Sequence, residues 1–348
     1  MESSSFTSSA QDDRRRRRAA AIEKLIHEFA PCENEDLLAQ MVVTICRLGA
    51  DGADRGDLKI LNTALKELRY AFKVFTPYAD IPKVSMFGSA RTPEDHPQYQ
   101  EAKKFAELMQ QDGWMVITGA GDGIMRAGHH GATQEASFGV AISLPFEQAA
   151  NPYIARDPKL VNFKYFFTRK LMFVKEARAI ALFPGGFGTQ DEGFEALTLV
   201  QTLKSVPVPI VLCHEPGGTY WTHWLRYVKE VLLAEHMIDP TDLELFRIVD
   251  RAEEAVAEIK QFYRRYHSSR YVGNQFVIRL NESIENGALR RLEQDFGDIV
   301  AEGQYELHSG PLDGEDGAYP DKARLSFVFD RRSASRLRQL IDAINANP

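Results

Sequence analysis

From Arg18 to about Phe75, apolar side chains recur at the period of an α-helix. Three stretches, residues 22–29, 37–45 and 60–72, repeat Leu, Ile, Val, Met or Phe every three or four positions, which aligns these side chains on one helix face. We therefore expect about three helices between Arg18 and Phe75, packed as a cap or as an oligomer contact.

Residues before this region have no such pattern. They are polar and serine-rich, and they end in the unbroken arginine run Arg14–Arg18. A secretion signal would continue into an apolar stretch, whereas here Glu23 and Lys24 follow a short alanine run. The pattern predicts a disordered basic tail over residues 1–18, either solvated or in contact with an anionic partner.

Between residues 81 and 266, short apolar runs alternate with amphipathic stretches and are joined by glycine turns. Such runs predict strands and helices in alternation, which is typical of a Rossmann-like α/β fold with a doubly wound parallel sheet. The expected strands are residues 84–87, 114–117, 139–144, 179–183 and 208–212, and the expected helices are residues 97–111, 124–137, 163–177, 191–202 and 221–234.

The remaining residues predict a smaller α+β domain in the order βαββα. Its expected strands are residues 275–280, 299–307 and 324–329, and its expected helices are residues 284–296 and 333–344. The predicted organisation is a tail (1–18), a helical segment (19–80), a Rossmann-like domain (81–266), a linker (267–274) and a small domain (275–348), for which we consider a regulatory role as a sensor of a small ligand.

Composition limits the function classes. A net charge of -7 argues against a nucleic-acid-binding surface, and no apolar run approaches the ~20 residues that cross a bilayer. Three scattered cysteines suit neither a disulfide framework nor a zinc site and fit a reducing cytoplasm. We expect no metal, no cofactor, no membrane and no nucleic acid.

The strongest chemical signal is Pro184–Glu192, which reads P-G-G-F-G-T-Q-D-E after an apolar strand and before a helix. Such a glycine turn directs free N–H groups and the helix dipole at one spot, which favours a phosphate. An acidic residue follows in place of the Lys-Ser/Thr of a nucleotide-triphosphate loop. The alternative interpretation is a plain tight turn.

Two other predicted strands also end in small-residue loops, Gly88–Arg91 and Thr118–Gly123. Ligands of open α/β sheets bind off the carboxyl ends of strands, so the three loops predict one pocket. The second loop lacks the third glycine of a dinucleotide fingerprint, since position 124 is Ile, and the next strand lacks its acidic residue. It therefore suits a nucleotide smaller than NAD.

Arg169 and Lys170 lie on a largely apolar predicted helix. Because an unpaired buried charge is costly, Arg169 needs an anion nearby. Glu147 is a further candidate for the pocket rim.

With these motifs, residues 83–260 resemble the LONELY GUY (LOG) family, whose members are often mislabelled lysine decarboxylases. The resemblance implies a Rossmann-like phosphoribohydrolase that cleaves nucleoside 5′-monophosphates to free base and ribose 5-phosphate, and it implies a homodimer or higher oligomer. The residues that it implicates are the catalytic Arg169 and Glu192, and the phosphate-binding Gly185, Gly186, Gly188 and Thr189. Further candidates for substrate contacts are Gly88, Ser89, Arg91, Gly119, Gly121, Gly123 and Lys170.

The additional terminal segments have no counterpart in short plant-type members, so AMP and nucleotide salvage are as plausible as a cytokinin nucleotide. A carrier that binds a nucleotide or a phosphorylated cofactor without cleaving it is the alternative. We expect Glu192 in the first turn of its helix, ionised by the dipole, to stabilise a ribosyl cation or to activate water. Arg169 would pair with Glu192 or phosphate, or polarise the departing base. No lysine has the setting that pyridoxal chemistry requires.

Overall fold

The computed structural model describes residues 3–29, 31–143, 149–315 and 317–346. The chain divides into two compact units, Met1–Lys66 and Glu67–Pro348. Each is described by itself.

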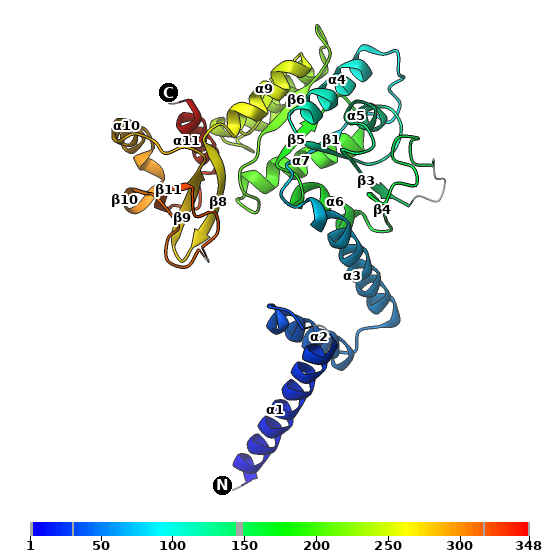
Figure 1. Cartoon of the computed structure of the whole chain (residues 1–348), viewed down its shortest axis with the longest axis vertical. Coiled ribbons are helices and arrows are strands. Elements are labelled where there is room, and N and C mark those ends of the chain that lie inside the picture. The colour runs from blue at the N-terminus through cyan, green and yellow to red at the C-terminus, as the bar shows by residue number, and fades with distance from the viewer. Residues whose placement is uncertain (1–2, 30, 144–148, 316, 347–348) are drawn as a thin grey trace. The chain divides into compact units, whose positions relative to one another are not determined.

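The first unit consists of α1 (Ser3–Phe29), α2 (Glu35–Ala50) and the beginning of α3 (Arg55–Phe75) (Figure 1). The three helices agree with the sequence pattern. α1, however, includes most of the residues for which the sequence predicts a disordered tail. Its alanines and arginines have high helix propensity, which explains how a stretch without an apolar face is helical.

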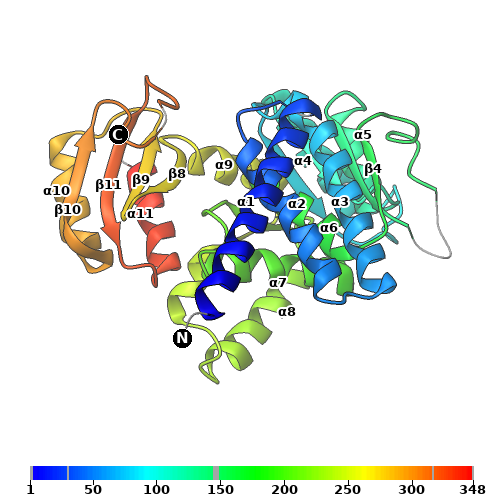
Figure 2. The same cartoon turned by 90° about the horizontal axis from the view of Figure 1, so that it is seen from below.

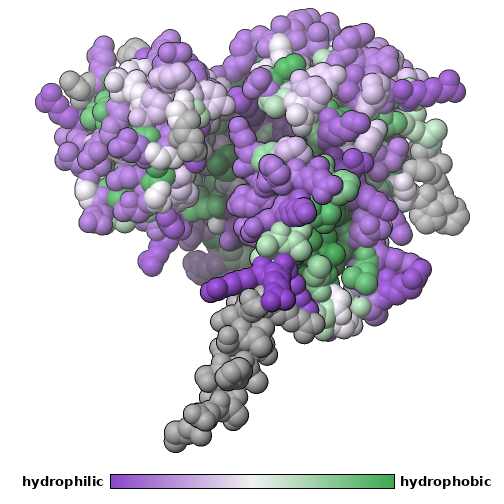
Figure 3. Space-filling model, turned by 60° about the horizontal axis from the view of Figure 1, so that its bottom comes forward, coloured by the Kyte–Doolittle hydropathy of each residue, from purple (hydrophilic) through white to green (hydrophobic). Residues whose placement is uncertain are grey.

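α2 has no buried residue. Its apolar side chains Leu37, Met41 and Ile45 are each about half exposed, and so is Leu61 of α3. Figure 3 colours hydrophobic residues green, and green patches lie among hydrophilic residues on the face that it shows.

The second unit contains a seven-stranded, fully parallel sheet in the order β4-β3-β2-β1-β5-β6-β7. The strands are β1 (Lys83–Phe87), β2 (Met115–Thr118), β3 (Ser137–Ile142), β4 (Leu160–Phe163), β5 (Ala179–Leu182), β6 (Ile210–Cys213) and β7 (Arg247–Val249). The predicted Rossmann-like fold is confirmed. The two edge strands β4 and β7 were not predicted, because neither is an unbroken apolar run.

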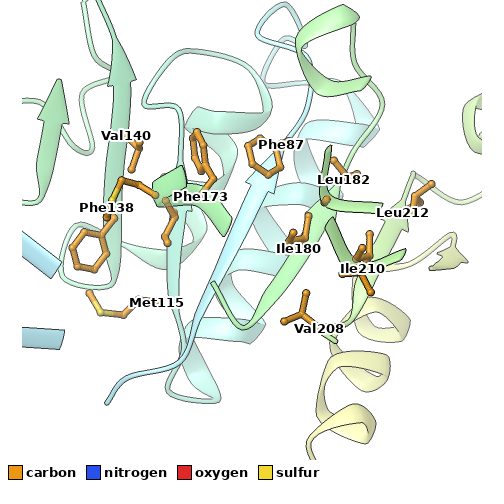
Figure 4. Close-up of a cluster of buried hydrophobic side chains, with 14 of the residues drawn as sticks. Phe87, Met115, Phe138, Val140, Phe173, Ile180, Leu182, Val208, Ile210 and Leu212 are labelled. Carbon is orange, nitrogen blue, oxygen red and sulfur yellow. The ribbon is translucent and has the colours of Figure 1, made fainter. Parts of the chain in front are cut away.

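Helices cover both faces of this sheet (Figure 1). They are α4 (Pro97–Gln111), α5 (Ile124–Ala132), α6 (Phe166–Lys175), α7 (Phe187–Gln201), α8 (Tyr220–Tyr227), which continues as a π-helical turn over Val228–Leu233, and α9 (Ala252–Phe262). One core cluster joins the sheet to α6, α7 and α8, and the other joins it to α4, α5 and α9. Figure 4 shows apolar side chains on one side of the sheet, among them Phe138, Ile180 and Ile210.

Two predicted element boundaries differ from the structure at functionally important places. α7 begins at Phe187, four residues before the predicted start, so the second half of the glycine motif is already helical. α5 ends at Ala132 and β3 follows from Ser137, two residues before its predicted start.

The C-terminal sheet is antiparallel, in the order β10-β11-β9-β8. Its elements are β8 (Tyr266–Val272), β9 (Gln275–Leu280), α10 (Asn286–Phe296), β10 (Val300–His308), β11 (Ala323–Phe329) and α11 (Ala334–Ala346) (Figure 2). Most of the predicted linker 267–274 is therefore strand β8. The sequence did not predict β8 because the strand is largely polar: only Tyr266 and Ser269 are buried.

Polar contacts join this sheet domain to the Rossmann-like domain. Asp242 accepts hydrogen bonds from Gln201 at the end of α7 (2.6 Å) and from Ser335 of α11 (2.8 Å). The fully buried Asn345 of α11 accepts from the backbone N–H groups of Arg265 and Tyr266 (2.8 and 3.0 Å). The end of α7 is thus tied to the small domain.

Candidate functional site

A cavity of about 800 Å³ lies where strands β1, β2 and β5 end. This volume falls within the range of small-molecule sites. The predicted residues that line it are Gly88, Ser89, Arg91, Gly119, Arg169, Gly185, Gly186, Gly188, Thr189 and Glu192. The three loops thus form one pocket, as the sequence predicts.

Three candidates, Lys170, Gly121 and Gly123, do not line this cavity. Lys170 forms salt bridges with Asp191 (2.9 Å) and Glu195 (2.8 Å), which tie α6 to α7. Gly121 lies against Met125, and a β-carbon there would be 2.7 Å from its Cε.

Gly123 has a structural function. Its φ is +61°, and a β-carbon would be 2.2 Å from the carbonyl oxygen of Ser89. It therefore lets the second loop pack on the first.

The glycines of the Pro184–Thr189 turn have different surroundings. A β-carbon on Gly185 would lie 2.1 Å from Thr189 Oγ1 and 2.9 Å from the Ser89 nitrogen, so the fold itself requires glycine there. A β-carbon on Gly186 or Gly188 would meet nothing within 4 Å. These two positions face open space in the pocket, which leaves the backbone accessible to a ligand.

The N-terminus of α7 forms one wall of the pocket. α7 begins at Phe187, and the N–H groups of Thr189 and Gln190 donate to the Gly186 carbonyl oxygen at 3.1 Å, so the N–H groups of Phe187 and Gly188 are the ones without an acceptor within the helix. These groups and the helix dipole favour an anion there. The walls include residues that the sequence analysis missed, namely Phe87, Ala90, Met125, Phe166, Phe187, Gln190, Asp191 and Tyr220.

Tyr220 is the most informative of the missed residues. Its hydroxyl donates to the Gly185 carbonyl oxygen at 2.6 Å and accepts from Gln190 Nε2 at 2.6 Å. It therefore braces the glycine turn from α8. No motif marks it, because it lies 31 positions after Thr189 in an ordinary helix start.

Glu192 lies in the second turn of α7, not in the first. Its side chain is only 8% exposed. Burial raises the pKa of Glu192 to about 7, against the opposing charges of Arg169 and Lys170. A pKa of about 7 leaves the carboxyl partly protonated at neutral pH, because desolvation outweighs the charges of Arg169 and Lys170. This differs from the expectation that the helix dipole keeps Glu192 ionised.

Arg169 is held over the pocket from α6. Its Nε donates to the Val140 carbonyl oxygen at 3.0 Å, and its guanidinium lies 5.1 Å from the centre of the Phe173 ring. Burial lowers the pKa of Arg169, and the charge of Glu192 partly offsets this. The guanidinium remains charged because arginine titrates far above neutrality.

The residues present do not fit pyridoxal phosphate. A Schiff-base lysine must lose its proton, but hydrogen bonds to Asp191 and Glu195 raise the pKa of Lys170 although burial opposes this. Lys175 pairs with Glu176 at 2.6 Å. In the described parts of the chain, no three His, Cys, Asp or Glu side chains gather as a metal site, and none of the helices there is long and apolar enough for a bilayer. Glu147 lies outside the described residues.

Residues 120–259 match the family described as "Possible lysine decarboxylase". The match confirms the resemblance of this part of the chain to LOG-type proteins. No curated protein matches the chain.

Several solved structures resemble half of the chain. One is the structural genomics target TM1055, with 23% identity over 52% of this chain and 99% of that protein, at a TM-score of 0.38. Others are the molybdenum cofactor carrier protein of Chlamydomonas reinhardtii (18% identity; 52% and 97%; TM-score 0.36) and the molybdenum cofactor binding protein of Rippkaea orientalis (18%; 52% and 96%; 0.35).

Proposed function

We propose that this protein is a nucleoside 5′-monophosphate phosphoribohydrolase, which hydrolyses the N-glycosidic bond of AMP or a cytokinin-type nucleotide to free base and ribose 5-phosphate. One observation supports this most strongly. The buried carboxyl of Glu192 and the guanidinium of Arg169 line the same cavity and influence each other's pKa beside the N-terminus of α7. Perturbed pairs of this kind in a cleft are typical of catalytic sites.

In this proposal the phosphate binds at the start of α7. Gly186 and Gly188 leave room for it, and the N–H groups of Phe187 and Gly188 donate to it. Thr189, whose hydroxyl lies against Gly185, shapes the same turn. The ribose then lies towards Glu192, which is one turn further along the helix.

Cleavage of the glycosidic bond develops positive charge on the ribose. An ionised Glu192 stabilises that charge or takes a proton from the attacking water. Arg169, which lines the same cavity, pairs with Glu192 or the phosphate, or polarises the departing base. Because the pKa of Glu192 is about 7, both protonation states are populated near neutral pH.

The direct test is incubation of the purified protein with AMP and a panel of other 5′-monophosphates in the presence of a chelator and without NAD. We expect adenine and ribose 5-phosphate, measured by chromatography. Glu192→Gln should abolish release while far-UV circular dichroism is unchanged. Glu195→Gln, one turn further on α7, is the matched control and should retain activity. Full activity of Glu192→Gln would contradict the assigned role.

The same incubation addresses a carrier function. If a nucleotide or phosphorylated cofactor binds and is recovered intact after overnight incubation, the protein is a carrier and not a hydrolase. The proposal also includes a cytoplasmic homo-oligomer. α6 exposes Phe166, Phe167 and Leu171 to about half of their surface, and light scattering measures whether this face associates.

A further inference from the structure

Asn151 lies outside the pocket, yet its side chain holds the turn that supports Arg169. Its amide nitrogen Nδ2 donates to the carbonyl oxygens of Ala120 (3.1 Å) and Gly121 (2.9 Å), and its backbone N–H donates to Ala120 as well (2.9 Å). Asn151 itself is 1% exposed. Three hydrogen bonds from one residue therefore fix two successive peptide groups of the second glycine loop.

This turn needs such support because its backbone is unusual. Ala120 has a φ of +64°, which costs a non-glycine residue free energy. Its N–H is bound by Thr118 Oγ1 at 3.0 Å. Without partners for its two carbonyl groups, the segment would relax towards a common conformation.

Gly119, at the start of the turn, lies against Arg169. A β-carbon built on Gly119 would come within 2.7 Å of Arg169 Nη2. The turn therefore packs directly against the guanidinium. The Arg169 side chain is also held by the hydrogen bond from its Nε to the Val140 carbonyl oxygen (3.0 Å). A shift of the turn would change where the guanidinium points.

His129 fixes the orientation of the Asn151 amide. The ring is fully buried, and its Nε2 lies 3.0 Å from the Phe138 carbonyl oxygen, which can only accept, so Nε2 bears the proton. Burial lowers the pKa of His129 to about 4 although the Phe138 carbonyl opposes this, so the ring is neutral. Nδ1 is then an acceptor for Asn151 Nδ2 at 3.0 Å, so the two hydrogens of this amide are shared among three acceptors: His129 Nδ1 and the carbonyl oxygens of Ala120 and Gly121. The Tyr153 N–H binds Asn151 Oδ1 at 3.2 Å, which completes the assignment.

We propose that Asn151, oriented by His129, is a positioning residue for the site: it holds the Gly119–Gly121 turn in its strained form and thereby sets the place of the Arg169 guanidinium. The kinetic part of this inference rests on the proposed hydrolase. The structural part does not, and the experiment separates the two.

The test compares Asn151→Ala with Asn345→Ala. Both asparagines are buried and both bridge backbone groups, but Asn345 lies in α11 and serves Phe262, Arg265 and Tyr266. Hydrogen–deuterium exchange of peptides covering residues 118–123, read by mass spectrometry, needs no substrate. Asn151→Ala should raise exchange there by about tenfold relative to the rest of the Rossmann-like domain, as local opening does, whereas Asn345→Ala should not.

With AMP, Asn151→Ala should lower kcat/KM about tenfold to a hundredfold, mostly through kcat, because a catalytic group is misplaced while the phosphate site is intact. Asn345→Ala should stay within about twofold, as expected for a distant site. If Asn151→Ala does not fold, Asn151→Asp retains the shape, presents acceptors to the two carbonyl groups, and should show both effects.

Unchanged local exchange in the Asn151 variant, or a kcat/KM equal to that of Asn345→Ala in an active enzyme, would overturn the inference. If the wild-type protein does not cleave nucleotides, the hydrolase proposal fails alone, and the exchange result still decides whether Asn151 positions the turn.

Discussion

Tyr220 and Gly185 are joined by a 2.6 Å hydrogen bond from the phenol to the carbonyl oxygen. It crosses from α8 to the end of β5, 35 residues apart in sequence. The bond holds the glycine turn from outside the motif, so the proposed phosphate site depends on a residue that the motif does not contain.

Tyr220→Phe removes this bond and the acceptor of Gln190. We expect the KM for AMP to rise about fivefold with little change in kcat, since a hydrogen bond is worth roughly 1 kcal/mol and the catalytic groups stay in place. Steady-state kinetics measures both constants. Tyr227→Phe, at the exposed end of α8, is the control and should behave as wild type. An equal effect of the two variants would contradict the bracing role.

The pH dependence of activity should follow the protonation of the Glu192 carboxyl. If the ionised form is the active one, kcat/KM rises with pH and reaches half its plateau near pH 7, because the pKa of Glu192 is about 7. Lys170 lowers this pKa, so Lys170→Met should move the midpoint to higher pH. A midpoint near pH 4.5 in the wild type, or a shift to lower pH in the variant, would contradict this environment for Glu192.

Stability should depend on pH through the same group. The pKa of Glu192 is raised from 4.5 to about 7 on folding, so the proton favours the folded state. This contribution is complete below pH 4.5 and is lost as pH rises through 7. Relative to wild type, Glu192→Gln should gain about 3 kcal/mol in free energy of unfolding between pH 4.5 and pH 8. Urea titrations at several pH values measure it, and a constant difference would refute it.

Gly185 and Gly186 are neighbours with opposite expected effects. Gly185→Ala brings a methyl group onto Thr189 and the Ser89 nitrogen and should cost about 1–3 kcal/mol of stability. Gly186 has a φ of -87° and open space around it, so Gly186→Ala should change stability by less than about 0.5 kcal/mol. It should instead weaken phosphate binding, measured by calorimetry with ribose 5-phosphate. The reverse order of effects would contradict the assignment of the two glycines.

In the C-terminal domain, Glu315 is fully buried between Arg279 (2.8 Å) and Arg324 (3.1 Å). Glu315→Gln leaves both guanidinium groups without a counter-charge and should destabilise the protein by about 3–5 kcal/mol. Asp298→Asn removes an exposed salt bridge to Arg336 and should cost less than about 1 kcal/mol. Thermal unfolding distinguishes the two, and similar melting temperatures would argue against the buried network.

The sequence predicts the central strands well because β1, β2, β5 and β6 are buried on both faces and read as unbroken apolar runs. β7 and β8 were missed for the opposite reason: β7 is partly exposed throughout, and β8 carries only two buried residues. The glycine loops revealed the pocket because sheet topology alone brings strand ends together.

The protonation of Glu192 was not predictable in the same way. A motif indicates which residues follow a turn, but the pKa of Glu192 depends mainly on how far burial removes its carboxyl from water. The early start of α7 adds to this, since it moves Glu192 from the dipole's end into the second turn. The roles of the site residues stay predictions until the variants are measured.

The hydrogen bonds of Asn345 link residues about 80 positions apart, from the end of α9 to α11. The Phe262 carbonyl oxygen and the N–H groups of Arg265 and Tyr266 therefore obtain these partners only after α11 has been synthesised. A shortened chain that stops after β11 would lack α11 and with it Asn345. The backbone between α9 and β8 would then be exposed to water and to proteases.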